Sequence, residues 1–161
     1  MDSSRVRVLF VCMGNICRSP LAEAVFHDLV TRARLSDRIS IESAGIGSWH
    51  VGELPDPRTR SVAEKRGLRL TSRARQVEFD DLDRFHLVIA MDEENVRGLE
   101  RIRAQAAPGA EVRRLREFDP QADELDVPDP YYGGDDGFER VHDMIERACE
   151  GLLEHIRETR L

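Results

Sequence analysis

The sequence predicts an α/β fold in which helices cover both faces of a parallel sheet. Short apolar segments rich in β-branched residues alternate along the chain with segments of helical periodicity. The clearest apolar segments, residues 6–11 and 87–91, hold too few polar residues for a solvated face, which is typical of strands buried on both sides. A helical segment separates each expected strand from the next, as parallel pairing requires.

The first half of the chain divides into two strands and two helices. The first expected strand is 6–11. Ser19 and Pro20 then predict a helix start, with Ser19 as the N-cap and Pro20 at the first helical position. Residues 39–43 alternate between apolar and polar, as a strand does. A second helix is expected at 56–67, with proline near its start and glycine at its end.

The second half predicts two more strands and two more helices. We expect strands at 87–91 and 112–115, with a helix at 92–102 between them. Residues 117–137 are rich in acids, proline and glycine and should form a surface loop. Residues 138–157 should form a long amphipathic helix. Its inward face is expected to hold Val141, Ile145, Ala148, Cys149, Leu152 and Ile156.

Composition and charge limit the classes of partner. The chain of 161 residues is expected to form a single domain, residues 1–161. It carries 31 acidic and 24 basic residues and a net charge of −7, whereas nucleic-acid binding relies on an excess of Lys and Arg, so no nucleic-acid partner is expected. The three cysteines have neither the pattern of a disulfide framework nor the spacing of a zinc site, so we expect no metal and no cofactor.

Targeting signals are also lacking in the sequence. It shows no signal-peptide core and no apolar run of membrane-spanning length. These observations predict a cytoplasmic protein without membrane insertion, and they leave export without a signal peptide open.

The segment CMGNICRS, residues 12–19, joins the first expected strand to the first expected helix. Ligands bind at the carboxyl ends of parallel strands, and backbone N–H groups at a helix N-terminus converge on an anion. Gly14 and Asn15 let the backbone curl, and Arg18 can bind two phosphate oxygens at once. We therefore expect a site for inorganic phosphate or another tetrahedral oxyanion. Its phosphate-binding residues would be Met13, Gly14, Asn15, Ile16, Cys17 and Ser19, with Arg18.

Cys12 determines what this segment can do with a bound phosphate. The same field that attracts an anion favours the thiolate, and a thiolate in this position can attack phosphorus in line. The hydroxyl of Ser19 can donate to the sulfur and help it to leave in a second step.

A phosphoryl transfer also needs a proton for the leaving oxygen. The acidic loop offers four candidates for the general acid, Asp119, Asp126, Asp129 and Asp135. The motif Asp-Pro-Tyr-Tyr favours Asp129, because the proline stiffens the turn and the two tyrosines can wall a pocket for a flat ring.

The segment CMGNICRSP, residues 12–20, resembles the active-site signature of the low-molecular-weight protein tyrosine phosphatases. The resemblance covers essentially the whole chain and continues through Ser43-Ala44-Gly45, Trp49 with Val51-Gly52, Ala74-Arg75-Gln76, Met91-Asp92 and Asp129-Pro130-Tyr131-Tyr132. It implies a three-layer α/β/α fold with a central four-stranded parallel sheet and a phosphate loop between the first strand and the first helix. It also implies metal-independent hydrolysis of phosphotyrosine in proteins through a cysteinyl-phosphate intermediate.

The resemblance further implies a role for each site residue. Cys12 would be the nucleophile, Arg18 the phosphate clamp, and Asp129 first the acid and then the base. Asn15 and Ser43 match positions that brace the loop. The positions that line the substrate entrance are matched by Trp49, Tyr131 and Tyr132. One departure is Ser72, where many members carry a histidine that supports the phosphate loop.

Two other functions stay open. Arsenate reductases of the same fold share such a loop, but they need a downstream relay of cysteines, whereas Cys149 stands alone on the expected inward face of the last helix. A phosphotyrosine-binding module without turnover is the second alternative. Cys17 either forms a reversible disulfide with Cys12, as its family counterpart can, or simply fills the loop. Among the histidines, His50 lies nearest to the expected entrance.

Overall fold

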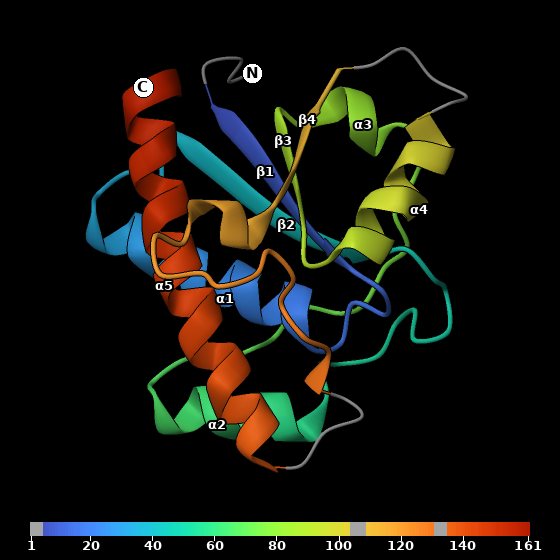
Figure 1. The fold of residues 1–161 in the computed structure, drawn as a ribbon, viewed down its shortest axis with the longest axis vertical. Helices are drawn as coiled ribbons and strands as arrows, with labels where there is room; N and C mark the ends of the chain where they lie inside the picture. The colour runs from blue at the N-terminus through green and yellow to red at the C-terminus, as the bar shows by residue number, and fades with distance from the viewer. Residues whose placement is uncertain (1–4, 104–108, 131–134) are drawn as a thin grey trace.

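A four-stranded parallel sheet forms the middle layer of the molecule (Figure 1). The computed structural model describes residues 5–103, 109–130 and 135–161. Its strands are β1 (Val6–Cys12), β2 (Ile39–Gly45), β3 (Leu87–Ala90) and β4 (Glu111–Arg114), and they lie in the order β2-β1-β3-β4. Every neighbouring pair is parallel, which confirms the predicted sheet.

Helices cover both faces of this sheet, so the predicted three-layer arrangement is confirmed (Figure 1). α1 (Arg18–Arg32) and α5 (Asp135–Arg160) pack on one face, and α3 (Asp81–Arg84) and α4 (Glu93–Arg103) on the other. α2 (Pro57–Lys65) packs against α5, and the 3₁₀ turn η1 (Leu115–Phe118) follows β4. The sequence did not predict α3 or η1, because elements of four residues are too short to show a period.

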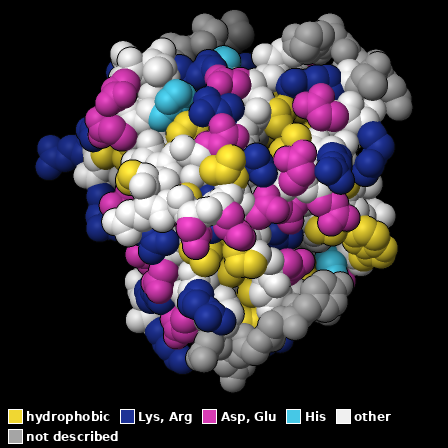
Figure 2. Space-filling model, viewed as in Figure 1, with side chains coloured by type: hydrophobic (Ala, Val, Ile, Leu, Met, Phe, Trp, Pro, Cys, Tyr) yellow, Lys and Arg dark blue, Asp and Glu magenta, His cyan; other side chains and the backbone are white. Residues whose placement is uncertain are grey.

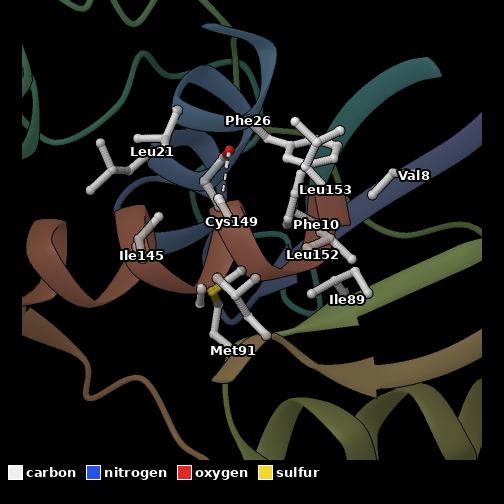
Figure 3. Packing of buried hydrophobic residues seen from close by; sticks show 14 of the residues in the cluster. Val8, Phe10, Leu21, Phe26, Ile89, Met91, Ile145, Cys149, Leu152 and Leu153 are labelled. Atoms are coloured by element: carbon white, nitrogen blue, oxygen red, sulfur yellow. Dashed lines mark hydrogen bonds between the residues drawn. The ribbon is translucent and has the colours of Figure 1, made fainter. Parts of the chain in front are cut away.

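The alternating side chains of β1 divide the core between the two faces. Val8 and Phe10 point toward α1 and α5, whereas Leu9 points toward α3 and α4, and all three are fully buried. The ring of Phe10 meets Phe26 of α1 edge to face, with the centroids 5.6 Å apart (Figure 3). Burial of each such side chain stabilises the fold by about 1.5–3 kcal/mol. The strand is therefore held from both sides, which fixes the position of its last residue, Cys12.

The last helix buries the face that the sequence predicts. All six residues of the predicted inward face are buried: Val141, Ile145, Ala148, Cys149, Leu152 and Ile156. Cys149 lies within the core between α5 and α1, and its thiol makes a long hydrogen bond of 3.9 Å to the carbonyl of Ala22 (Figure 3). Because burial raises the pKa of Cys149, this side chain is a neutral packing group at physiological pH.

The two predicted helix starts have opposite outcomes. α2 begins as predicted at a proline, and the carboxylate of Asp56 accepts a backbone N–H of the first turn at 2.8 Å. The predicted start of α1 is wrong: the helix begins at Arg18, with Cys17 in the N-cap position, so that Ser19 and Pro20 lie inside the first turn. The hydroxyl of Ser19 bonds to side chains of the preceding loop instead of capping the helix.

Acidic and basic side chains are interspersed over the face of the molecule that Figure 2 shows. Several form ion pairs, as Arg66 does with Glu139 and Asp143. Within the three described ranges, none of the helices is both long and apolar enough to cross a membrane. The same ranges contain no group of three His, Cys, Asp or Glu side chains that could hold a metal ion.

Candidate active site

The segment between β1 and α1 lies at the carboxyl ends of the strands, where the strand order reverses. β2 lies on one side of β1 and β3 on the other, so loops from three strands meet beside Cys12. A cavity of about 420 Å³ opens there. It is lined by Cys12, Met13, Gly14, Ile16, Cys17, Arg18, Trp49, His50 and Asp129. Most of the residues predicted for the site are thus brought together in one cavity.

Residues 13–18, here called the phosphate loop, have two carbonyl groups that bond to backbone N–H groups of other segments. Backbone N–H groups from other segments donate to the carbonyls of Met13 and Ile16 in the loop and to that of Cys12 just before it, and these bonds fix the loop from both sides. The donor–acceptor pairs are Ile46 N to Cys12 O at 3.0 Å, Gly47 N to Met13 O at 2.9 Å and Asp56 N to Ile16 O at 2.8 Å. With these carbonyls bonded to other segments, the loop can present N–H groups to the cavity.

The N–H groups of the phosphate loop have no acceptor among the described residues. The first turn of α1 contains no acidic side chain, so nothing there offsets the positive end of the helix dipole. Free N–H donors at a helix N-terminus are a binding site for an anion. The geometry therefore fits the tetrahedral oxyanion that the sequence predicts.

Cys12 lies at the closed end of the cavity and is 2% exposed. Its Sγ lies 3.0 Å from the Oγ of Ser19 and accepts the backbone N–H of Ser19 at 3.4 Å. Hydrogen-bond donors stabilise a thiolate over a thiol. Ser19 itself lies behind the loop and does not line the cavity, so its contribution is to the sulfur.

Asn15 braces the phosphate loop from behind. Its backbone takes a φ of 57°, the left-handed geometry that the sequence suggested for this residue. The side-chain amide donates to Ser19 Oγ at 2.7 Å and to Ser43 Oγ at 3.0 Å, and its oxygen accepts the N–H of Arg75 at 3.0 Å. Asn15 is 3% exposed, so water has little access to compete for these hydrogen bonds. Loop, β2 and the segment after α2 are joined through this one side chain.

Arg18 is the fixed cation of the site. Its Nη1 donates to Asp92 Oδ2 at 2.6 Å and to the carbonyl of Val127 at 2.8 Å, and Nη2 lies 3.5 Å from Asp129 Oδ2. Burial alone would lower the pKa of Arg18, but the sulfur of Cys12 and the two carboxylates outweigh burial and raise it. The Nε–H is buried and has no partner among the described residues. This donor is available to an oxyanion.

The structure separates Asp129 from two of its rivals for the role of acid. Asp129 lines the cavity, and its side chain is 35% exposed. Asp126 accepts the N–H of Glu93 at 2.9 Å and therefore caps α4. Asp119 is buried and accepts the N–H of Gln121 at 2.9 Å. The side chain of Asp135 lies outside the described residues.

The mouth of the cavity is apolar on one side. Trp49 is 70% exposed, and its ring lies directly over Gly47, where even a Cβ would come within 1.8 Å of it. A large side chain exposed to this extent is available to contact a ligand. His50 joins it in the cavity wall. Tyr131 and Tyr132, which the sequence also predicts here, lie outside the described residues.

Cys17 also lines the cavity, and its thiol is held in the neutral form. Burial raises the pKa of Cys17 to about 12, and a hydrogen bond to Thr59 opposes only part of that shift. At neutral pH Cys17 is a thiol and does not compete as a nucleophile. Ser72 does not line this cavity; it borders a second one together with Glu23, and its hydroxyl lowers the pKa of the Glu23 carboxyl in part.

Sequence reasoning gave no role to three residues that hold the site. Asp92 fixes the guanidinium of Arg18, Arg75 binds Asn15, and Glu23 accepts the hydroxyl of Ser43 at 2.5 Å. Asp92 could have been found, because it lies two residues beyond the end of β3, the strand adjacent to β1. Glu23 and Arg75 had no such signal, since their positions depend on how α1 and the segment after α2 pack.

Gly45, the last residue of β2, sets how closely the phosphate loop approaches the sheet. A Cβ at this position would lie 3.0 Å from Met13 O, Gly14 C and Asn15 N, which are all backbone atoms of the loop. Because none of these atoms belongs to a flexible side chain, Gly45→Ala should displace the loop. We expect binding of inorganic phosphate, measured by calorimetry, to weaken roughly tenfold, as the loss of one charge-assisted hydrogen bond would produce.

Gly137→Ala is the matched control for this substitution. A Cβ at Gly137 meets no atom within 4 Å, so phosphate affinity should not change. Unaltered phosphate affinity in Gly45→Ala would show that the loop accommodates the methyl group, and that Gly45 does not set the shape of the phosphate site.

Fold and site together define a class of protein: a parallel α/β domain with a cysteine and an arginine lining one cavity, at the loop that follows its first strand. A family model described as low molecular weight phosphotyrosine protein phosphatase matches residues 7–161. The chain belongs to this family.

Individual relatives agree with this assignment. The low molecular weight protein-tyrosine-phosphatase of Streptomyces coelicolor is 49% identical over 154 residues, which cover 94% of each chain. The crystal structure of YfkJ from Bacillus subtilis is similar to this fold with a TM-score of 0.92 and 41% identity, over 100% of both chains. The Drosophila arginine phosphatase DARP gives a TM-score of 0.88 and 33% identity, over 93% of this chain and 97% of that chain.

Proposed function

We propose that the protein hydrolyses phosphotyrosine in protein substrates through a cysteinyl-phosphate intermediate. The observation that carries this proposal is one cavity that has the Cys12 sulfur at its closed end, Arg18 in its wall and Asp129 beside Arg18. Nucleophile, phosphate clamp and acid are the three groups that metal-independent phosphoryl transfer needs. We further propose that residues 1–161 act as one domain and that the protein works in the cytoplasm.

In the first step the thiolate of Cys12 attacks phosphorus. The S–P bond forms while the P–O bond to tyrosine breaks, and Asp129 transfers its proton to the departing phenolate oxygen. Arg18 and the N–H groups of the phosphate loop bind the three remaining oxygens. The unpartnered Nε–H of Arg18 and the two loop carbonyls that bond to other segments support this assignment.

In the second step water replaces the sulfur on phosphorus. Asp129, now ionised, takes a proton from the water as it attacks, the S–P bond breaks, and inorganic phosphate is released. The sulfur leaves as a thiolate, and the hydroxyl of Ser19, 3.0 Å away, can donate a hydrogen bond to it. The same residue thus serves as acid in one step and as base in the next.

The depth of the nucleophile supports tyrosine as the substrate. Cys12 is 2% exposed at the end of the cavity, so a short serine ester would have to bring its backbone into the site. Trp49 and Ile16 line the cavity with apolar surface that suits a flat ring. Cys149, buried in the core, is in no position to relay electrons for arsenate reduction.

Steady-state kinetics with matched phosphopeptides test the proposal. We expect a phosphotyrosine peptide to have a kcat/KM at least roughly 100-fold above those of the phosphoserine and phosphoarginine peptides of the same sequence. Arsenate with thioredoxin should give no turnover. Binding of the phosphotyrosine peptide without hydrolysis would instead identify a binding module, and preferred hydrolysis of phosphoarginine would assign a different substrate.

A further inference from the structure

A chain of hydrogen bonds leads from the nucleophile to the far side of α1. Cys12 Sγ lies 3.0 Å from Ser19 Oγ, and Ser19 Oγ lies 2.7 Å from the amide nitrogen of Asn15. The same nitrogen lies 3.0 Å from Ser43 Oγ, which in turn lies 2.5 Å from a carboxylate oxygen of Glu23. Glu23 is half-buried, and it borders a second cavity of about 520 Å³ that is separate from the one at Cys12.

The donor and the acceptor of each hydrogen bond in this series follow from groups that can play only one of the two roles. The N–H of Arg75 can only donate, so the Asn15 atom that it meets is the oxygen, and the NH₂ group faces Ser19 and Ser43. Both hydroxyl oxygens therefore accept from Asn15. Each serine must place its own hydrogen elsewhere, and Ser43 directs it to Glu23. Ser19 has two acceptors in reach, the sulfur of Cys12 at 3.0 Å and the carbonyl of Ala44 at 3.4 Å, and the shorter contact favours the sulfur.

We infer that Glu23 is a positioning residue: by accepting the Ser43 hydrogen, its carboxylate leaves the Ser43 oxygen open to the Asn15 amide that Arg75 orients, which keeps Asn15 in place against Ser19 while the Ser19 hydroxyl donates to Cys12. An ionised carboxylate can only accept, so the hydrogen of Ser43 has one favourable direction. A neutral carboxyl or amide can also donate to Ser43, which would turn the Ser43 hydrogen toward the amide of Asn15. The Ser43 hydroxyl and the NH₂ group of Asn15 would then both present hydrogens to each other. Their repulsion would shift the Asn15 side chain and weaken its hydrogen bond to Ser19.

The surroundings of Glu23 make its ionisation sensitive to pH. Burial raises the pKa of this carboxyl, as does the neighbouring Glu42, while the hydroxyls of Ser43 and Ser72 and the charge of His27 lower it in part. Asp28 and Arg69 border the same cavity. Because the folded-state pKa lies above the unfolded one, the folded protein binds the proton more tightly, and Glu23 reduces stability as the pH rises past the unfolded pKa. The ionised form of Glu23 therefore lowers the free energy of unfolding relative to the protonated form.

Glu23→Gln tests the inference, which rests on the proposed phosphatase activity. At pH 7.5 we expect kcat for p-nitrophenyl phosphate to fall about fivefold, the effect of weakening one hydrogen bond, while KM stays near that of the parent protein. The melting temperature at this pH should not fall. As the pH drops below the pKa of Glu23, the ratio of the two kcat values should approach one, because the protonated carboxyl and the amide are equivalent in the chain.

A double-mutant cycle shows whether Glu23 acts through Ser19. In a Ser19→Ala background, Glu23→Gln should produce no further loss of kcat. Asp28→Asn is the matched control: Asp28 borders the same cavity from the same helix but bonds to Arg32, so its kcat and pH profile should equal those of the parent protein.

The inference is overturned if Glu23→Gln keeps the full kcat at pH 7.5, or if its loss of kcat is the same with and without the Ser19 hydroxyl. Neither result would touch the proposed function, because the parent protein would still hydrolyse the ester. A parent protein without phosphatase activity would instead refute the proposed function itself.

Discussion

Cys12→Ser is expected to lower the turnover of phosphotyrosine peptides by about 10⁴-fold or more, while inorganic phosphate still binds. A serine hydroxyl ionises far less readily than a thiol and is a much weaker nucleophile, whereas the donors of the phosphate loop and the guanidinium of Arg18 remain in place. Turnover should be measured with enough enzyme to detect a single catalytic cycle. Phosphate binding is measured in parallel by calorimetry.

The other two cysteines provide the controls for this substitution. Cys149→Ala changes only the core, so turnover per folded molecule should be that of the parent protein. With a pKa of about 12, only about one Cys17 side chain in 10⁵ is ionised at pH 7, so iodoacetate should label Cys12 and spare Cys17. Phosphate should protect Cys12 from the reagent. Substantial turnover by Cys12→Ser would rule out the cysteinyl-phosphate intermediate.

Asp129→Ala is expected to lower kcat/KM by roughly 10²–10⁴-fold for esters with poor leaving groups. The reason is that Asp129 supplies the proton to the departing oxygen, and an oxygen of high pKa cannot leave without one. An activated ester such as p-nitrophenyl phosphate should lose much less, since its phenolate leaves unprotonated. The measurement is the slope of log kcat/KM against leaving-group pKa, which should become steeper in the variant.

Asp123→Asn is the matched control on the same loop. Its carboxylate is 89% exposed and pairs with Arg116, away from the cavity residues, so the slope should not change. An equal loss of kcat/KM across all leaving groups in Asp129→Ala would contradict the assignment, because the substitution would then be acting on the shape of the site and not on proton transfer.

Local patterns were sufficient to predict the sheet, the main helices and the segment of the nucleophile. The apolar runs of β1 and β3, the Asp56 cap of α2 and the inward face of α5 are all encoded within a few turns or residues of chain. Cys12 and Arg18 belong to the same category. Their spacing and the glycine between them lie in one segment, so its chemistry could be judged without knowledge of any distant contact.

Only the tertiary structure decided which distant groups complete the site. Arg18 meets Asp92 and Val127, which are 74 and 109 residues away along the chain, and Ser43 meets Glu23 from another element. The start of α1 belongs here too, because contacts of the phosphate loop outweigh the capping preference of a serine. Helix, strand and capping propensities depend only on residues that are close together in the sequence. Which carboxylate lines the cavity, and which holds an arginine or a hydroxyl in place, depends on packing that brings separate segments within hydrogen-bond distance.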